Sequence, residues 1–546
     1  MKKVLLLLGL MLLVIGMSFM VVSCSSDNDE NNVDSKKEVN GIKLIDGIYY
    51  NINSDTKSAA IVKYLYKKYS GDIVIPSSVT FEGINYKVTS IGASAFIGCS
   101  DLTSISIPNS VTTIGEKAFE NCTALTSVKI PDGVTSIGDM AFYYCIHLTS
   151  ISIGKNVETI YHETFDFCNL KKVEINSSAI VSKDYQLTSL NYYFDNQVEE
   201  YIIGESIKSI GNYAFFGCEK LKAVSIPNSV TSIGDFSFRK CSALTSITIP
   251  NSVKSMGEGV FFLCERLSSI NLSTSLTTIE KEAFFKCKSL TSINIPNSVT
   301  EIRENAFEEC EKLSLITVPD GVSIGEKAFD KTAWYTSQPN GVVYLGNHLY
   351  TYKDKYNMPE NTSIDIKDGT CSIADYAFQF CSNIVSITIS NSMKRIGKGA
   401  FDGCKGLTSI TLPNSVNSIG SFAFSGCSAL KSIAIPNSVT TIEGLFPVCT
   451  SLTSVILGNG VTSIHDEAFY KCHSLKDMYC YAEQVPETNN PLIFDGSNYR
   501  NATLHVPAAS LEAYRNAEPW KNFGSIVALT DEDPKLARKS VCPGEI

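Results

Sequence analysis

Residues 241–263 read CSALTSITIPNSVKSMGEGVFFL, and this text recurs with small changes along most of the 546-residue chain. The cysteine marks a period of 23 residues. Three series keep that step, from Cys99 to Cys168, from Cys218 to Cys310 and from Cys381 to Cys427. Cys449 then follows after 22 residues, and Cys472 after 23. A fixed period of this length indicates a solenoid, in which each repeat forms one coil that stacks on the next.

The first half of the repeat has the pattern of a short strand. Ile247 and Ile249 alternate with Ser246 and Thr248, which is the period-two pattern of a strand buried on one face. Pro250 then ends the strand and turns the chain, at a place where its missing N–H costs little.

The second half of the repeat is predicted to form another side of the coil. A run such as Val111 to Gly115 gives a second short strand, and we expect Gly115 to permit a bend. Ala118 and Phe119 then start a short helical or 3₁₀ turn whose phenylalanine fills the interior.

No single 23-residue coil can bury its own apolar residues, so neighbouring coils must stack. We therefore predict a repeat solenoid, a right-handed coil that is mainly β, with parallel strands and short helical or 3₁₀ turns around one unbroken interior. Stacked strands lie about 4.8 Å apart, so about sixteen turns would make a rod roughly 75 Å long.

The repeat resembles the BspA-like leucine-rich repeat, whose pattern is Leu-x-x-Ile-x-Ile-Pro-x-x-Val-x-x-Ile-Gly-x-x-Ala-Phe-x-x-Cys. The likeness covers about residues 73–480, and residues 45–76 and 502–520 resemble the caps of that family. Caps cover the apolar ends of a solenoid. The predicted units are a cap at 41–72, the solenoid at 73–480 with insertions at about 176–203 and 330–370, a cap at 481–529, and a disordered tail at 530–546.

The N-terminus has the features of an export signal. Lys2 and Lys3 precede an apolar stretch from Val4 to Val22, which could also serve as a permanent anchor helix. Residues 21–24, VVSC, resemble the bacterial lipobox, so we interpret 1–24 as a lipoprotein signal peptide that ends at a lipidated Cys24; the alternative is a plain signal peptide. Residues 25–40 form a polar, acidic linker that looks like a surface-export signal, which favours the outer membrane, facing the exterior.

Composition and motifs argue against several functions. The net charge is −10 and no stretch is rich in Lys and Arg, so a nucleic-acid partner is not expected. The sequence has no C-x-x-C pair, no H-E-x-x-H motif, no Asp-rich calcium loop and no Gly-rich phosphate loop, and its six histidines share no repeat position. We therefore predict no catalytic residues, metal, cofactor or small-molecule substrate.

Eighteen cysteines in an exported chain raise the question of disulfides. The fourteen repeat cysteines occupy one position per coil and should stack side by side, at a spacing too wide for a disulfide. We expect an inert column of buried thiols. Cys371, Cys480 and Cys542 fall outside this column and are the candidates for reactive thiols.

Two kinds of surface could bind a partner. Outward-facing pairs such as Ser104 and Ser106 form a row of small hydroxyls, which either serves solubility or offers weak hydrogen bonds. Aromatic residues gather where the period breaks; they either bind a ligand or pack the insertions onto the rod. The candidate ligand-binding residues are Tyr192, Tyr193 and Phe194 in the first break, and Trp334, Tyr335, Tyr344, Tyr350, Tyr352 and Tyr356 in the second.

The resemblance implies a surface-exposed, lipid-anchored protein that mediates adhesion. Its expected partners are host extracellular-matrix or cell-surface proteins, glycans or other cells. The alternative is a non-adhesive scaffold or accessory protein of an outer-membrane complex, for example one for nutrient uptake. The two differ in whether the chain binds host material or co-purifies with outer-membrane proteins.

Overall fold

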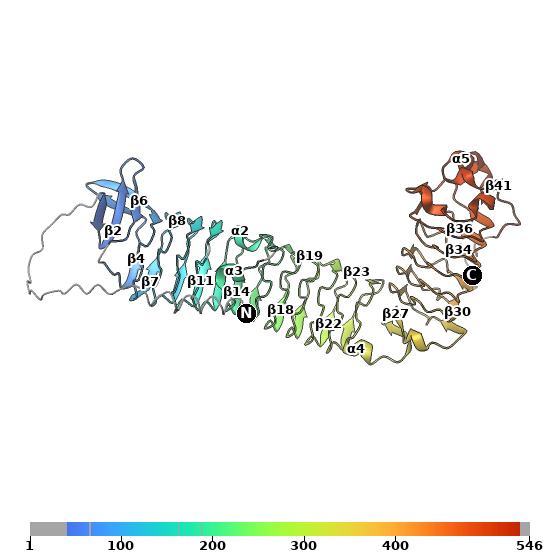
Figure 1. Ribbon diagram of the computed structural model, residues 1–546, viewed down its shortest axis with the longest axis horizontal. Coiled ribbons are helices and arrows are strands. Elements are labelled where there is room, and N and C mark those ends of the chain that lie inside the picture. The colour runs from blue at the N-terminus through green and yellow to red at the C-terminus, as the bar shows by residue number, and fades with distance from the viewer. Residues whose placement is uncertain (1–40, 65–66, 162, 187, 535–546) are drawn as a thin grey trace, which may run out of the picture.

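The computed structural model describes residues 41–64, 67–161, 163–186 and 188–534. Cys24 and the predicted signal peptide and linker lie outside these residues, as do Cys542 and the tail from residue 535. Within the described residues the chain coils as a mainly β solenoid with few helices (Figure 1). Most turns contribute one strand to each of two sides.

The first side carries the strand of the Ile-x-Ile segment. Parallel pairs keep like residues in register, as where Ile247 pairs with Ile270. In the described chain nineteen strands follow one another along this side: β4 (Gly71–Val74), β7 (Leu102–Ser106), β9 (Ser127–Lys129), β11 (Ser150–Ile153), β13 (Lys172–Ile175), β14 (Glu200–Ile203), β16 (Ala223–Ser225), β18 (Ser246–Thr248), β20 (Ser269–Asn271), β22 (Ser292–Asn294), β24 (Leu315–Thr317), β28 (Thr362–Asp365), β30 (Ile384–Thr388), β32 (Ser409–Thr411), β34 (Ser432–Ile435), β36 (Ser454–Leu457), β38 (Asp477–Cys480), β40 (Thr503–Val506) and β41 (Ser525–Ala528).

The second side carries the short strand that ends in Ile-Gly in most turns. Its members are the end of β6 (Ile84–Ile91), β8 (Thr113–Ile114), β10 (Ser136–Ile137), β12 (Thr159–Ile160), β15 (Ser209–Ile210), β17 (Ser232–Ile233), β19 (Ser255–Met256), β21 (Thr278–Ile279), β23 (Glu301–Ile302), β25 (Ser323–Ile324), the start of β27 (His348–Lys353), β29 (Ser372–Ile373), β31 (Arg395–Ile396), β33 (Ser418–Ile419), β35 (Thr441–Glu443), β37 (Ser463–His465) and β39 (Glu487–Thr488).

The caps are built partly from solenoid turns. The N-terminal cap adds β1 (Ile42–Ile45), β2 (Ile48–Asn53), β3 (Ser58–Ile61) and β5 (Ser78–Phe81), and the C-terminal cap adds α5 (Leu511–Asn516) with short 3₁₀ turns at Pro491–Phe494, Tyr499–Asn501, Ala508–Ser510 and Trp520–Asn522. Strands β4, β40 and β41 extend the first side through both caps. The predicted sixteen turns were therefore too few, because turns without a ladder cysteine left no mark in the sequence.

Stacked phenylalanines fill the interior. The Phe261 ring centroid lies 5.4 Å from those of Phe238 and Phe284, and each of the three side chains is fully buried. Offset stacking at such separations is favourable beyond the burial of area.

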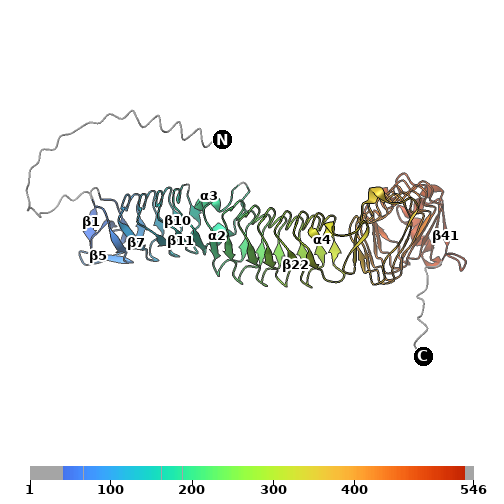
Figure 2. The ribbon, with the colours of Figure 1, turned by 90° about the horizontal axis from the view of Figure 1, so that it is seen from below.

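The interior is not one unbroken core, contrary to our expectation. The buried hydrophobic residues form two clusters, one reaching back to Ile48 and the other running on to Phe523. At their junction lie α4 (Ala333–Thr336), the antiparallel hairpin of β26 (Gly341–Leu345) and β27, which contributes side chains to both clusters, and a 3₁₀ turn at Lys355–Asn357. We call residues 41–331 the first arm, 332–358 the bend and 359–534 the second arm. Figure 1 shows the second arm turning away at the bend, and Figure 2 shows it nearly end-on.

The two predicted insertions differ in kind. Residues 176–203 complete an ordinary coil of greater length, since Ile175 pairs with Ile203 twenty-eight residues on. This coil includes α2 (Ser178–Val181) and α3 (Asn191–Phe194). The stretch at 330–370 is a true interruption, because it contains the bend.

Glycine in the Ile-Gly step has a different role from the one predicted. Gly115 does not adopt positive φ; a Cβ there would lie 2.7 Å from the backbone N of Ala93 in the preceding turn. This glycine is needed where neighbouring coils approach closely, and the left-handed conformation is used elsewhere in the turn.

The thiol column is buried as expected, with a feature that the sequence analysis missed. Cys264 Sγ donates a hydrogen bond to the carbonyl oxygen of Phe238 at 3.1 Å. Ten further ladder cysteines bond the preceding phenylalanine in the same way. Cys480 is also fully buried, against Tyr514, which removes it from the candidates for reactive thiols. Cys371 is part-exposed.

We expect the column to be chemically inert in the folded protein. Burial raises the pKa of Cys381 and Cys472 to about 12, so the reactive thiolate is scarce at neutral pH. In a chain from residue 25 with Cys542→Ser, a thiol reagent should modify only Cys371 natively and all sixteen described cysteines in denaturant. Rapid native labelling of several ladder cysteines would contradict this expectation.

The helices of the described residues are all short. None of them combines the length and the apolar character that crossing a bilayer requires.

Candidate binding site

The aromatic residues of the first break mostly support the coil. Phe194 is fully buried and stacks on Phe165 with ring centroids 5.5 Å apart. Tyr193 packs against the core, and Tyr192 keeps 48% of its surface exposed. Phe194 therefore belongs to the interior and not to a ligand surface.

The aromatic residues of the second break divide between packing and a cleft. Tyr350 is buried and closes the end of the first arm, with its ring centroid 6.0 Å from that of Phe329. Trp334 packs against the first core and Tyr344 against the second. Tyr335, Tyr350, Tyr352 and Tyr356 line one cleft between the arms.

This junction cleft has a volume of about 410 Å³, within the usual range for small-molecule sites. The lining comes from the end of the first arm, from the bend and from the first turn of the second arm. The lining residues beyond the four tyrosines are Glu326, Lys327, Asp330, Thr351, Asp354, Lys355, Asp375, Tyr376, Ala377, Gln379 and Phe380.

Two carboxylates lie deep in the cleft, one from each arm. Asp330 Oδ1 accepts a hydrogen bond from the Tyr350 hydroxyl at 2.7 Å, and Asp375 Oδ1 accepts one from the Lys398 backbone N–H at 2.8 Å. Burial raises the pKa of both carboxyls. The backbone N–H of Asp375 also donates to the Ile324 carbonyl at 2.9 Å, which links the two arms directly.

One lysine, Lys355, lies over two aromatic rings at the mouth of the cleft. Lys355 Nζ lies 5.8 Å from the ring centroid of Tyr356 and 5.6 Å from that of Phe380. It also donates to the Gln379 carbonyl oxygen at 3.0 Å. These are cation–π distances, so the chain supplies its own cation to this pair of rings.

The repeat identifies the family. The family description "BspA type Leucine rich repeat region" matches residues 75–192, 186–314 and 350–476, with six copies. The chain belongs to the BspA-type leucine-rich-repeat family. The gap between the second and third matches, residues 315–349, overlaps the bend. None of the curated protein sequences compared with the chain matches it.

Several solved structures are similar to this BspA-type chain. A Bacteroides ovatus leucine-rich repeat protein is 25% identical over 80% of this chain and 94% of its own, with a TM-score of 0.26. A leucine rich cell surface protein of Faecalibacterium prausnitzii is 24% identical over 92% and 97%, with a TM-score of 0.23. The pneumococcal vaccine antigen PcpA is 18% identical over 90% and 100%, with a TM-score of 0.28. The family match, rather than these low-scoring superpositions, places the chain.

Tyr376 and Phe380 also line the cleft but were not predicted, because they stand at regular positions of the BspA-type turn. Phe380 precedes the ladder cysteine, where the next two turns have Gly403 and Gly426, and all three have positive φ. A Cβ on Gly403 would lie 2.4 Å from the Phe380 ring, and one on Gly399 would lie 2.4 Å from that of Tyr376. The sequence signal that could have identified them is a large aromatic residue with glycine at the same position of the next turn.

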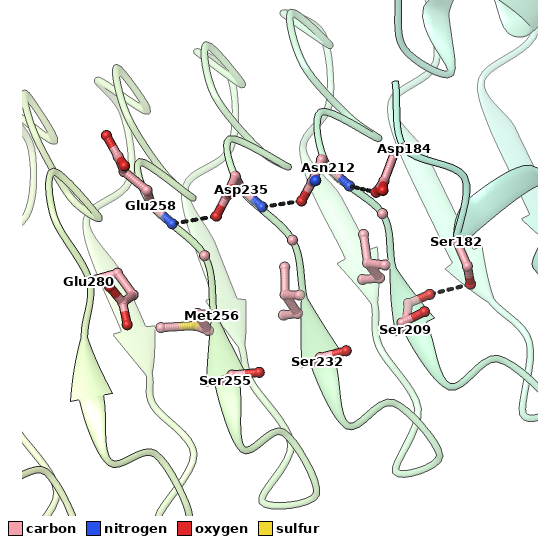
Figure 3. Close-up of a pocket in the computed structure, with 15 residues that line it drawn as sticks. Ser182, Asp184, Ser209, Asn212, Ser232, Asp235, Ser255, Met256, Glu258 and Glu280 are labelled. Atoms are coloured by element: carbon pink, nitrogen blue, oxygen red, sulfur yellow. Dashed lines mark hydrogen bonds between the residues drawn. The ribbon is translucent and has the colours of Figure 1, made fainter. Parts of the chain in front are cut away.

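A shallow groove of about 680 Å³ runs along β15, β17 and β19 of this BspA-type solenoid (Figure 3). Its polar side chains hold neighbouring coils together: Asp235 Oδ1 accepts from the Glu258 backbone N–H at 2.9 Å, and Asn212 Oδ1 accepts from that of Asp235 at 2.7 Å. A further depression of about 360 Å³ shares Glu258 with this groove and Asp375 with the junction cleft, so it lies between the two.

Other surfaces of the BspA-type chain add less. The hydroxyl row points outward as predicted, with Ser104 and Ser106 exposed and Ile105 buried between them. In the part of the chain that the structure describes, no group of three or more His, Cys, Asp or Glu side chains is arranged to hold a metal ion. The junction cleft combines enclosure, exposed rings and polar groups, which makes it the best candidate site.

Proposed function

We propose that this chain is a surface-displayed adhesion protein, anchored to the outer membrane through a lipid on Cys24. Its partners would be host matrix or cell-surface proteins, glycans or other cells. The contact region would include the junction cleft.

One observation carries the proposal. Tyr356 keeps 90% of its surface exposed and Phe380 keeps 55%, side by side at the cleft. Exposed aromatic residues beside a cleft are typical of binding surfaces, because they supply apolar contact area when a partner covers them. The solenoid would hold this cleft at the bend of a long rigid body.

Adhesion can be tested together with the lipid anchor. Bacteria that export the chain should bind immobilised matrix proteins, glycans or other cells, and Cys24→Ser should abolish cell binding because the protein leaves the surface. The purified chain from residue 25, which lacks position 24 and therefore the lipid, should still bind the same targets. Protease added to intact cells should degrade the wild-type protein.

The result can also count against adhesion. Protection from protease on intact cells would remove the surface location. A purified chain that binds no member of the panel, but co-purifies with outer-membrane proteins, would favour the accessory scaffold instead.

A further inference from the structure

We propose that the junction cleft binds a neutral saccharide of one or two rings. This inference rests on the proposed binding function and gives the chemical class of the ligand. The cleft is formed only where the bend brings the last turn of the first arm against the first turn of the second arm.

The cleft offers apolar faces of the right kind. A pyranose ring has a face of C–H groups and a rim of hydroxyls, so its site needs flat apolar surface with polar groups around it. Tyr356 and Phe380 present exposed rings at the mouth, and Tyr352 and Tyr376 are partly exposed beside them. The volume of about 410 Å³ is small for a folded protein segment and suits a compact ligand.

The charges in the cleft disfavour ionic ligands of either sign. An anionic ligand would meet four carboxylates, those of Glu326, Asp330, Asp354 and Asp375. A cationic ligand would compete with Lys355, which already lies over the rings of Tyr356 and Phe380. Lys353 likewise occupies the Tyr335 ring, with Nζ 5.2 Å from its centroid. A neutral ligand is repelled neither by the carboxylates nor by the lysines.

The polar groups match a rim of hydroxyls. A hydroxyl both donates and accepts, so it can bond a carboxylate on one side and an ammonium or amide on the other. The cleft has both kinds: Asp330 and Asp375 accept from opposite walls, while Lys327 and Lys355 are donors. Asp330 Oδ1 accepts from Tyr350, while Asp375 Oδ1 accepts from the Lys398 backbone N–H and lies 3.6 Å from the Arg395 guanidinium. A carboxylate can accept about four hydrogen bonds.

Phe380 stands at the turn position just before the ladder cysteine, where the backbone is left-handed in turn after turn. Its φ is 60°, and Lys240 and Lys286 at the same position have φ values of 62° and 60°. Gly403 and Gly426 occupy this position in the next two turns. Phe380 differs from these residues because it places an exposed aromatic ring beside the cleft, where the ring can contact a ligand.

The test begins with the chain from residue 25 on an array of oligosaccharides. One arm holds neutral mammalian glycans that end in galactose, mannose or N-acetylglucosamine, and another holds neutral bacterial and plant glucans, mannans and galactans. Sialylated, sulfated and amine-bearing saccharides are the charged controls. We expect a neutral member to bind, and the arm that contains it identifies the source.

Two matched variants locate the site. Phe380→Gly should weaken the dissociation constant for the array ligand roughly tenfold or more by calorimetry, without loss of folding because glycine suits that φ. Phe167→Gly is the control, since Phe167 has the same repeat position, a φ of 60° and 59% exposure in the first arm. It should leave binding unchanged.

The outcomes separate this inference from the proposed function. Absence of array binding, preference for charged saccharides, or equal effects of the two variants would each overturn the saccharide site. If cells still adhered to matrix proteins in those cases, adhesion would stand. If a saccharide bound here while intact cells adhered to no target, adhesion would fall and the site would stand.

Discussion

Replacing Phe261 by alanine is expected to lower the free energy of unfolding of the first arm by about 3–5 kcal/mol. The ring is fully buried and lies between Phe238 and Phe284, each 5.4 Å away. Neighbouring coils hold their own stacks in register, so the cavity can collapse little. Urea unfolding, followed by hydrogen exchange in peptides of each arm, measures the effect.

Where Phe261→Ala destabilises the chain is as informative as how far it lowers the free energy of unfolding. Because the buried residues form two clusters, exchange should accelerate around Phe261 and in adjoining coils while the second arm keeps its protection. Phe167→Ala, at a side chain that is 59% exposed, is the control and should change stability by less than about 1 kcal/mol. Equal acceleration in both arms would show that the two cores unfold as one.

Replacing Tyr350 by alanine should cost a similar amount, about 3–5 kcal/mol, and should loosen the bend. Tyr350 covers the last phenylalanine of the first arm, and its hydroxyl donates to Asp330 and accepts from the Phe329 N–H at 2.9 Å. Tyr350→Phe keeps the ring and removes only these bonds, so its cost should be about 1–3 kcal/mol. Unfolding of both variants by urea gives the comparison.

The effect of Tyr350→Phe should depend on pH. Burial raises the pKa of Asp330, so the folded state binds that proton more tightly than the unfolded chain, and this group favours folding less as pH rises through its folded pKa. The Tyr350 hydroxyl, which this variant lacks, donates to Asp330 and stabilises its ionised carboxylate. The cost of Tyr350→Phe should therefore be largest at neutral pH and shrink in acid. A cost independent of pH would contradict the assigned role of the Tyr350–Asp330 bond.

The repeat made most of the fold predictable. A period of 23 residues with Ile247 and Ile249 in alternation determines the strand, the buried face and the stacking. Each coil has the same apolar pattern and can bury it only against its neighbours. The turns of the caps escaped notice because they lack the cysteine that marked the others. The S–H bond to Phe238 escaped notice because it depends on how two coils meet, and a single repeat does not contain that information.

The site was predictable only in part. The second break drew attention to Tyr335, Tyr352 and Tyr356, which the structure brings to one cleft. It also included Tyr350, which is buried, because an aromatic residue in an irregular stretch has no periodicity to tell packing from exposure. Phe380 and the opposing carboxylates come from regular turns that only the bend brings together.

The separate interiors of the two arms affect how such a chain can change in length. Gain or loss of one whole coil in the first arm would move the bend along the rod axis by about 4.8 Å without altering any residue that lines the cleft. The first arm can thus serve as an adjustable spacer. Homologous chains could differ widely in reach while presenting the same contact point to their surroundings.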